Sequence, residues 1–308
     1  MANSSYQNDK SLSIGENSVR CLYKEFNKEY LNYYKKQVEK FQRRFPDITN
    51  KNRRTGKSLK NICFFIWYYT DGEKGKVFDL LFDTSVLLST QDDFLDNPQI
   101  DYQNKEKFHS ICKDLLNGKN CNLAKIDTAQ LRELISLWKT IIKEIKNSCS
   151  QVVYLYWKET AEQMNKAMKK EVYLSKNQRI AFDDYIKKAV YSIGAIFIWT
   201  TYLTIKKAPI STLEKLKPIF LRGATIARFS NDISSYKKNK NKINAINIIK
   251  NQKNPEKYIL NLIKKEKQKL TKDLKKLKIE KQIEQTIQRS TSFLIEFYKK
   301  SDFTKNLF

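Results

Sequence analysis

A run of closely spaced carboxylates near the end of an apolar helical segment has the chemistry of a metal site. Asp92 and Asp96, in the string DDFLD, are four residues apart, so they share one face of a helix. The apolar residues upstream continue the same stripe, and carboxylates in such a stripe are costly unless a cation lies between them. Hard oxygen ligands of this kind suit Mg²⁺. The alternative is a solvated helix end, although acidic residues at a helix C-terminus oppose the helix dipole.

A second polar string, RFSNDISSYKKN at residues 228–239, places side-chain oxygens along another helix. Three of these side chains recur at every fourth residue and form one stripe: Asn231, Ser235 and Asn239. Arg228 and Lys238 flank that stripe. Metal-ligating oxygens beside Arg and Lys suit a metal–diphosphate cluster. The alternative is a polar helix C-terminus enriched in Lys, which is common.

The elements that must position these strings are helices. Gly (7) and Pro (5) are scarce among the 308 residues, whereas Lys, Leu, Ile and Glu are abundant. Apolar residues recur at helical spacing, and no alternating strand pattern persists. The sequence therefore predicts an all-α fold, with a flexible tail over 1–17 followed by a single domain over 18–308. The strongest helical patterns cover 76–96, 129–146, 152–169, 213–238, 258–277 and 280–299.

Three other segments are less regular. Residues 53–57 indicate a basic loop that contains Gly56, and residues 61–69 fit either a buried helix or a strand. The mostly apolar stretch 179–206 contains Ser192 and Gly194. A Gly and a Ser inside an apolar helix predict a kink at that point.

The two polar strings together resemble the motifs of class I terpene cyclases. That family carries a first motif, DDxxD, and a second motif, NDxxSxxxE, often extended to RxxNDxxSxxKE. This chain has DDFLD at 92–96 and RFSNDISSYKKN at 228–239. A third stretch, 185–194, is similar to the family's YxxxxxxSxG pattern, where a helix that faces the cavity breaks. The resemblance implies the class I terpenoid synthase fold, a single-domain helical bundle around a central cavity.

The resemblance also implies roles for individual residues. Three Mg²⁺ ions, or Mn²⁺ in their place, would be held by Asp92, Asp96, Asn231, Ser235 and Asn239. The substrate diphosphate would be bound by Arg228 and Lys238. Catalysis would depend on Asp92, Asp96, Asn231 and Arg228. Asp93 is expected either to contact the metal ligands without binding the metal itself, or to point away from the site. The expected cavity-lining residues are Phe78, Trp157, Ser192, Gly194 and Trp199.

Two positions depart from the family pattern. The final Glu of the second motif is Asn239 here, and an uncharged amide oxygen binds a metal more weakly than a carboxylate. The Arg-Tyr pair near the C-terminus of many microbial members is absent. Lys299 or Lys300, next to Tyr298, is the nearest replacement for the missing charge.

The implied activity is ionisation of an isoprenyl diphosphate, with farnesyl diphosphate as the default substrate. Cyclisation of the carbocation to a terpene, here a sesquiterpene, and release of diphosphate would follow. The nearest alternative is a chain-elongating isoprenyl diphosphate synthase, which resembles a pattern with two DDxxD motifs. NDxxS replaces the second of these here. The only histidine, His109, makes His-based acid–base chemistry an unattractive reading.

The net charge of +26 permits an alternative from another class, a nucleic-acid or anionic-membrane binding module. The excess is concentrated in residues 236–280, with 15 Lys and 4 acidic residues. Apolar positions in that segment keep a helical period, so we interpret these lysines as the solvated face of core helices.

The remaining features favour a cytoplasmic enzyme that acts on a small molecule. The five cysteines have no CxxC spacing, and the polar N-terminus lacks the apolar core of a secretory signal. No uninterrupted apolar run reaches membrane-spanning length. We therefore expect a monomer or homodimer without nucleic-acid partners and without stable membrane insertion.

Overall fold

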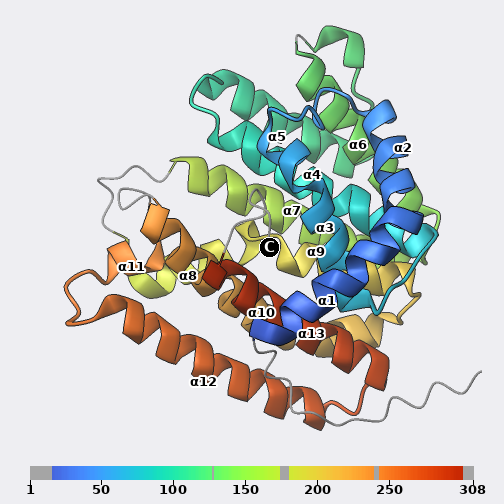
Figure 1. Ribbon diagram of the computed structural model, residues 1–308. Helices are drawn as coiled ribbons and strands as arrows, with labels where there is room; N and C mark the ends of the chain where they lie inside the picture. The colour runs from blue at the N-terminus through green and yellow to red at the C-terminus, as the bar shows by residue number, and fades with distance from the viewer. Residues whose placement is uncertain (1–15, 127, 174–179, 239–242, 301–308) are drawn as a thin grey trace, which may run out of the picture.

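The apolar periodicity of the sequence appears in the structure as a set of packed helices (Figure 1). The computed structural model describes residues 16–126, 128–173, 180–238 and 243–300. Within these ranges every regular element is a helix, which confirms the predicted all-α fold. The first half of the chain forms α1 (Glu16–Glu29), a π-helical turn (Tyr30–Tyr34), α2 (Lys35–Arg44), α3 (Arg54–Thr70), α4 (Lys76–Asp96), α5 (Tyr102–Leu116), a 3₁₀ turn (Leu123–Lys125) and α6 (Ala129–Lys146). The second half forms α7 (Gln151–Tyr173), α8 (Phe182–Ser192), α9 (Ala195–Ile205), α10 (Ile210–Lys238), α11 (Ala245–Ile248), α12 (Pro255–Lys276) and α13 (Lys281–Lys300).

Six helices form the frame that surrounds the interior. The helix α4 packs against α3, α7 and α9, while α10 packs against α7, α9 and α13. The helix α13 also packs against α3, which closes the ring. Residues 1–15 of the predicted tail lie outside the described residues.

The most apolar helix, α9, lies at the centre of the fold. Every residue from Ala195 to Thr204 is buried, so this helix has no solvated face. A helix that is apolar all round is stable in water only when other helices enclose it. Together α8 and α9 form a stretch, 182–205, that is long and apolar enough to cross a membrane by length and composition alone. Because 67% of that window is buried inside the protein, it matches a core helix.

The segment whose type the sequence left open is helical. Residues 61–69 belong to α3, and most of their side chains are buried. The expected basic loop at 53–57 is wrong, because α3 already begins at Arg54. This earlier start brings the Arg54 side chain up beside α4.

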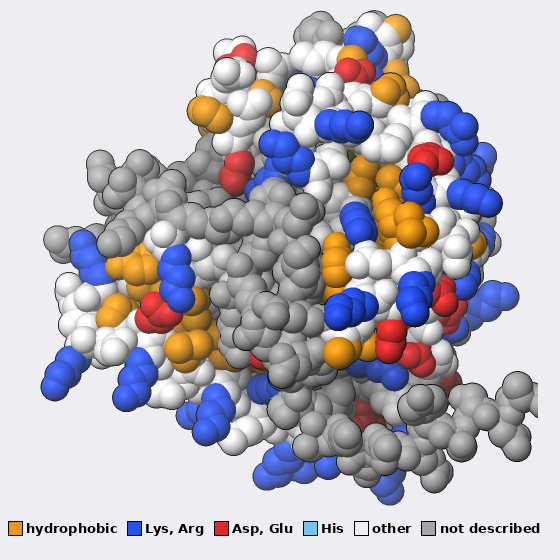
Figure 2. Space-filling model, in the orientation of Figure 1, with side chains coloured by type: hydrophobic (Ala, Val, Ile, Leu, Met, Phe, Trp, Pro, Cys, Tyr) orange, Lys and Arg blue, Asp and Glu red, His pale blue; other side chains and the backbone are white. Residues whose placement is uncertain are grey.

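The lysine-rich segment contains α12, an outer helix that packs on α10, α11 and α13. Its apolar stripe is buried and consists of Ile259, Ile263, Leu270 and Leu274. Seven of its eight lysines are exposed: Lys257, Lys264, Lys265, Lys269, Lys272, Lys275 and Lys276. Figure 2 shows Lys and Arg side chains along the lower edge of the molecule, where α12 lies in Figure 1. The segment is therefore an amphipathic core helix with a solvated basic face, as its periodicity predicted.

Candidate active site

A cavity of about 460 Å³ lies inside the helical frame. Its polar end faces solvent, because Asp96 is exposed and the Asp92 side chain is 43% exposed. Its inner part is apolar and closed, and Trp199 there is only 1% exposed. The apolar part is lined by Ile62, Phe65, Leu88, Leu95, Ala195, Ile198, Trp199 and Leu294. A charged mouth above an apolar chamber suits a ligand with an ionic head and a hydrocarbon body.

The first polar string supplies one side of the mouth. Asp92 and Asp96, on the last turns of α4, both line the cavity. Asp93 is turned away from it, since one residue along a helix rotates the side chain by about 100°. Its carboxylate accepts hydrogen bonds from the Thr55 amide at 2.8 Å and the Thr55 hydroxyl at 2.7 Å. Burial raises the pKa of Asp93, and the two Thr55 hydrogen bonds oppose that rise. Asp93 thus fixes α4 against α3.

An arginine that the sequence reasoning missed lies in the same mouth. The Arg54 guanidinium contacts Asp92 at 2.7 Å (Nη1–Oδ2) and Asp93 at 3.8 Å (Nε–Oδ1). Arg54 also lines the cavity. Burial would lower the pKa of Arg54, but the carboxylates around it raise it overall. The first polar string is therefore accompanied by a permanent cation from α3.

The second polar string supplies the opposite side of the mouth. Asn231 and Ser235 line the cavity from α10, as does Ser234. Lys238 is the last residue of α10, and only its backbone is described. Asn239 lies outside the described residues. Oxygens from α4 and α10 therefore converge on one opening from two separate helices.

The Arg228 side chain lies at the cavity edge in a buried charge network. Its guanidinium donates to Glu171 at 2.7 Å (Nη2–Oε1) and 3.2 Å (Nη1–Oε2), and pairs with Asp232 at 2.9 Å. The Nε group also donates to the Tyr185 hydroxyl at 2.8 Å, and that hydroxyl donates to Asp232. Burial would lower the pKa of Arg228, but Asp232 and Glu171 raise it well above its ordinary value. Arg228 is therefore a fixed cation, and Glu171 and Asp232 are the partners that sequence reasoning missed.

The predicted kink is present as a break between α8 and α9. Ser192 ends α8 and lines the cavity, and its hydroxyl lies 3.5 Å from Nη1 of Arg228. Gly194 has φ = +75°, a conformation that L side chains rarely adopt. The expectation that Gly194 lines the cavity is wrong. It faces α4, where an added Cβ would lie 2.7 Å from Leu88 Cδ1, and its neighbours Ile193 and Ala195 line the cavity instead.

Two of the expected cavity aromatics are wrong as well. Phe78 precedes Asp92 by fourteen residues on α4, roughly 21 Å along the helix axis. It packs below the cavity against Tyr34, at 4.7 Å between ring centroids. Trp157 lies behind α9, where its Nε1 donates to Thr201 at 2.9 Å. The type of a residue and its position on a helical stripe do not fix how far its side chain lies from the cavity, which explains both errors. Trp199 does line the cavity.

The oxygens at the mouth suit a divalent metal that is held partly by protein side chains and partly by a bound phosphate. Among the described residues, no group of three or more His, Cys, Asp or Glu side chains could form a metal cage. The mouth offers two carboxylates with neutral oxygens from Asn231 and Ser235. Mg²⁺ is usually held in this way, by one or two carboxylates with the rest of its shell from substrate phosphates and water.

Terpene synthases are among the solved structures that share this architecture. Abietadiene synthase from Abies grandis aligns with a TM-score of 0.70 and 15% identity, over 93% of this chain and 38% of that one. The chain thus spans less than half the length of that protein. Linalool/nerolidol synthase from Streptomyces clavuligerus, in complex with 2-fluorogeranyl diphosphate, aligns with a TM-score of 0.62 and 10% identity, over 79% of this chain and 89% of that one. At these identities the likeness shows the shared fold.

Sequence comparison identifies the family. No curated protein matches the chain. The family model described as terpene synthase family 2, C-terminal metal binding, matches residues 83–257, which is more than half of the chain and includes both polar strings. The resemblance inferred from the two motifs is thereby confirmed. This chain belongs to the terpene synthase family and has the metal-binding domain of that family.

Proposed function

We propose that the chain is a class I terpene cyclase that ionises an isoprenyl diphosphate and cyclises the resulting carbocation. One observation carries the proposal: α4 and α10 bring both motifs to the mouth of a single apolar cavity. The family assignment and the shared fold support the same reaction class. The charged mouth would hold the diphosphate, and the apolar chamber would hold the hydrocarbon chain.

In this proposal the residues at the mouth hold the leaving group. Asp92, Asp96, Asn231 and Ser235 would ligate Mg²⁺, together with Asn239 from outside the described residues. The bound metal supplies positive charge to the diphosphate oxygens. Arg228 and Arg54 add fixed cations on opposite sides, and Lys238 is proposed as a further one. The allylic C–O bond then breaks, both electrons leave with the diphosphate, and the cation remains in the cavity.

The inner residues would keep the cation from water and shape its path. The chamber below the mouth is lined mainly by aliphatic and aromatic side chains. Phe65 and Trp199 border this space, and aromatic rings attract cations through their faces. No nucleophilic side chain is required, since the reacting carbon is attacked by a double bond of the same substrate.

The cavity volume supports a substrate of fifteen carbons or fewer. A hydrocarbon carbon with its hydrogens fills about the same volume as a liquid water molecule, roughly 30 Å³, so chains of 10, 15 and 20 carbons need about 300, 450 and 600 Å³. The cavity of about 460 Å³ includes the charged mouth, so its apolar part is smaller than this and offers a hydrocarbon chain at most about the middle value. We therefore propose farnesyl diphosphate as the substrate and a sesquiterpene as the product. The five free cysteines support a cytoplasmic location for this enzyme.

The test is turnover with a defined set of substrates. Purified protein is incubated with geranyl, farnesyl or geranylgeranyl diphosphate, with Mg²⁺ or with EDTA, and the extracts are analysed by gas chromatography–mass spectrometry. Asp92→Ala and Asn231→Ala are compared with Asp114→Ala, which removes an exposed carboxylate that pairs with Lys119 far from the cavity. A cyclic product that requires Mg²⁺, is lost in the first two variants and is kept in Asp114→Ala is the expected result.

Other outcomes identify other functions. A longer diphosphate that forms only after isopentenyl diphosphate is added would assign a chain-elongating synthase. Salt-dependent retention on nucleic acid without any turnover would favour the binding-module alternative. A terpene that forms equally well in EDTA would contradict the proposed metal role.

A further inference from the structure

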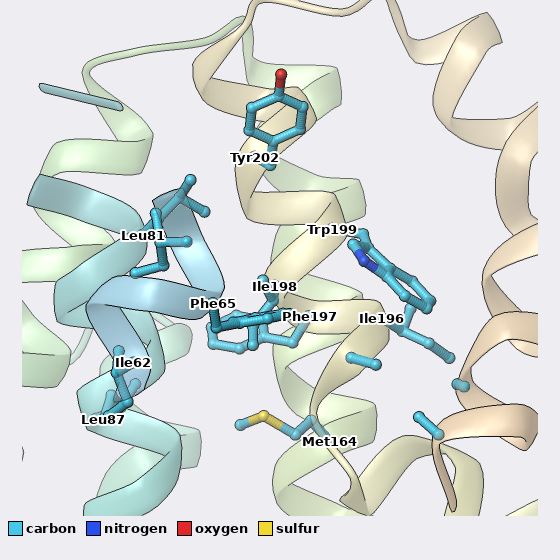
Figure 3. Packing of buried hydrophobic residues seen from close by; sticks show 14 of the residues in the cluster. Ile62, Phe65, Leu81, Leu87, Met164, Ile196, Phe197, Ile198, Trp199 and Tyr202 are labelled. Carbon is cyan, nitrogen blue, oxygen red and sulfur yellow. The ribbon is translucent and has the colours of Figure 1, made fainter. Parts of the chain in front are cut away.

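Trp199 is one of the side chains that form the deep end of the cavity. Trp199 lines the cavity from α9 and is 1% exposed. In Figure 3, Phe65 extends toward α9 from the left, and the Trp199 indole extends from α9 to the right. On α4, Ser85 is the deepest lining residue, while Leu81, one turn lower, no longer faces the cavity. Phe65, Ser85 and Trp199 therefore mark its floor.

The Trp199 indole is held at this position by two other helices. Its Nε1 donates a hydrogen bond of 2.8 Å to Ser290 Oγ on α13. Its six-membered ring lies against Gly223 on α10, where an added Cβ would be 2.7 Å from Cη2 and 3.0 Å from Cζ3. The Phe220 ring, one turn earlier on α10, packs on the indole at 5.6 Å between centroids. The glycine leaves the space that the ring occupies, and Trp199 also lines the cavity.

We infer that Trp199, placed by Gly223 and Ser290, sets the upper limit on the length of the isoprenyl chain that the cavity accepts. The inference rests on the proposed function and adds its substrate class. Trp199 would touch the end of the hydrocarbon chain. Gly223 and Ser290 would act through Trp199, as positioning residues.

The depth of the cavity agrees with this limit. Gly223 precedes Asn231 by eight residues on α10, which is roughly 12 Å at 1.5 Å per residue. On α3, Phe65 follows Arg54 by eleven residues, or roughly 16 Å. An extended chain advances about 1.2 Å per bond, so 10-, 15- and 20-carbon isoprenyl chains reach about 10, 15 and 20 Å. The two depths, roughly 12 and 16 Å, bracket the reach of a fifteen-carbon chain, whereas an extended twenty-carbon chain is longer than both.

Moving the floor should change chain-length preference in both directions. Gly223→Ala adds a methyl group behind a ring that Ser290 pins, so the indole must shift toward the cavity and shorten it. The same change favours the helix, because Ala has a higher helix propensity than Gly. Trp199→Leu removes most of the floor and lengthens the chamber into the space of the indole. Ser290→Ala releases the ring without adding volume and should act in the same direction as Trp199→Leu, but more weakly.

Trp157→Leu is the matched control for Trp199→Leu. Trp157 is also fully buried, and its Nε1 also donates to one hydroxyl, that of Thr201. It does not line the cavity. Loss of a buried indole and its hydrogen bond is therefore common to both variants, and only Trp199→Leu changes the floor. Circular dichroism and thermal melting report whether each variant is folded.

The experiment measures kcat/KM with geranyl, farnesyl and geranylgeranyl diphosphates for the full chain and the four variants. A parallel measurement records the rise in Tm caused by non-ionisable thiolodiphosphate analogues of the same three lengths. We expect Trp199→Leu to raise the ratio of twenty- to fifteen-carbon kcat/KM by about tenfold or more, in line with the cost of misfitting one or two methylenes. Gly223→Ala should raise the ratio of ten- to fifteen-carbon kcat/KM by a similar factor. The analogue-induced Tm shifts should follow the same order.

Several results would overturn the inference. It fails if Trp157→Leu shifts the ratios as much as Trp199→Leu does, or if a folded Gly223→Ala keeps the wild-type ratio of ten- to fifteen-carbon kcat/KM. If the wild type turns over no substrate but is stabilised by the analogues, the proposed function fails, and the analogue order in the variants still decides the role of the floor. Absence of stabilisation by every analogue in every folded variant would reject the floor together with the assignment of the cavity.

Discussion

The second motif contains adjacent residues, Asn231 and Asp232, for which the structure predicts opposite consequences of substitution. Asp232 is completely buried. Its carboxylate forms an ion pair with Arg228 Nε at 2.9 Å and accepts hydrogen bonds from Tyr185 Oη at 2.9 Å and the Ala245 amide at 2.9 Å. Burial raises the pKa of Asp232, and Arg228 with the two hydrogen bonds opposes that rise. Its carboxylate therefore joins α8, α10 and the start of α11.

Asp232→Ala should be strongly destabilising. Breaking a buried, hydrogen-bonded ion pair costs about 3–5 kcal/mol, because the partner charge stays buried. Glu171 remains beside Arg228, so we expect a value near the lower limit, about 3 kcal/mol. At about 2–4 °C per kcal/mol for large domains, this lowers Tm by roughly 6–12 °C. Asp232→Asn keeps part of the hydrogen bonding and should lie between this variant and the wild type.

Thermal melting, followed by circular dichroism, is the assay, with Asn231→Ala as the matched neighbour. Asn231 lies at the cavity mouth and is only partly buried, so its truncation should change stability by less than about 1 kcal/mol. Activity should disappear in Asn231→Ala although the fold melts near the wild-type temperature. A wild-type Tm for Asp232→Ala, or an equal loss of stability in both variants, would refute the proposed division between a structural and a ligating residue.

Two further predictions concern charges outside the second motif. Arg54→Gln should tighten Mn²⁺ binding in the absence of substrate by about two- to fivefold, because Asp92 no longer has to give up an exposed ion pair worth up to about 1 kcal/mol. Electron paramagnetic resonance of free Mn²⁺ measures the dissociation constant, and weaker Mn²⁺ binding in the variant would contradict the prediction. Asp83 is buried below the cavity, and burial, only partly offset by Arg44 and Lys40 and reinforced by Asp79, raises its pKa from 3.8 to about 7. The contribution of the neutral Asp83 carboxyl to the free energy of unfolding is therefore fully present below about pH 4. It is lost as pH rises through about 7, by at most about 4 kcal/mol. Asp83→Asn should flatten the pH dependence of Tm over this range and raise Tm at pH 8. An unchanged slope in Asp83→Asn would show that other groups cause it.

The helices could be predicted where their own residues specify them. The helices α4, α7, α10 and α12 have long apolar stripes, and their type and approximate extent follow from the period. The start of α3 could not be placed, because its N-cap residue is Arg53 and makes no side-chain capping hydrogen bond. Without a Ser, Thr, Asp or Asn at that position, the sequence shows no helix start signal.

The motif residues were found because each motif lies on a single helix and is read by spacing. Their partners Arg54 and Glu171 come from other helices, so their proximity depends on tertiary packing. A signal for Arg54 did exist. A short connection joins α3 to α4, and Arg54 and Asp92 are equally far, nineteen residues, from Glu73 in that connection. In an antiparallel helix pair, residues equally distant from the turn lie at the same level.

The charge arrangement at the mouth indicates what kind of ligand can bind there. Asp92 is already neutralised by Arg54, and Arg228 is already neutralised by Glu171. A metal ion alone must displace Arg54 from Asp92, and a diphosphate alone must displace Glu171 from Arg228. A metal–diphosphate complex presents positive charge to the carboxylates and negative charge to the arginines, so each displaced pair is replaced by a stronger one. The mouth is therefore expected to select the complex over either component, and the separate affinities of Mn²⁺ and diphosphate should each rise when the other is present. Independent binding of the two ligands would show that the two charged sides of the mouth are not coupled.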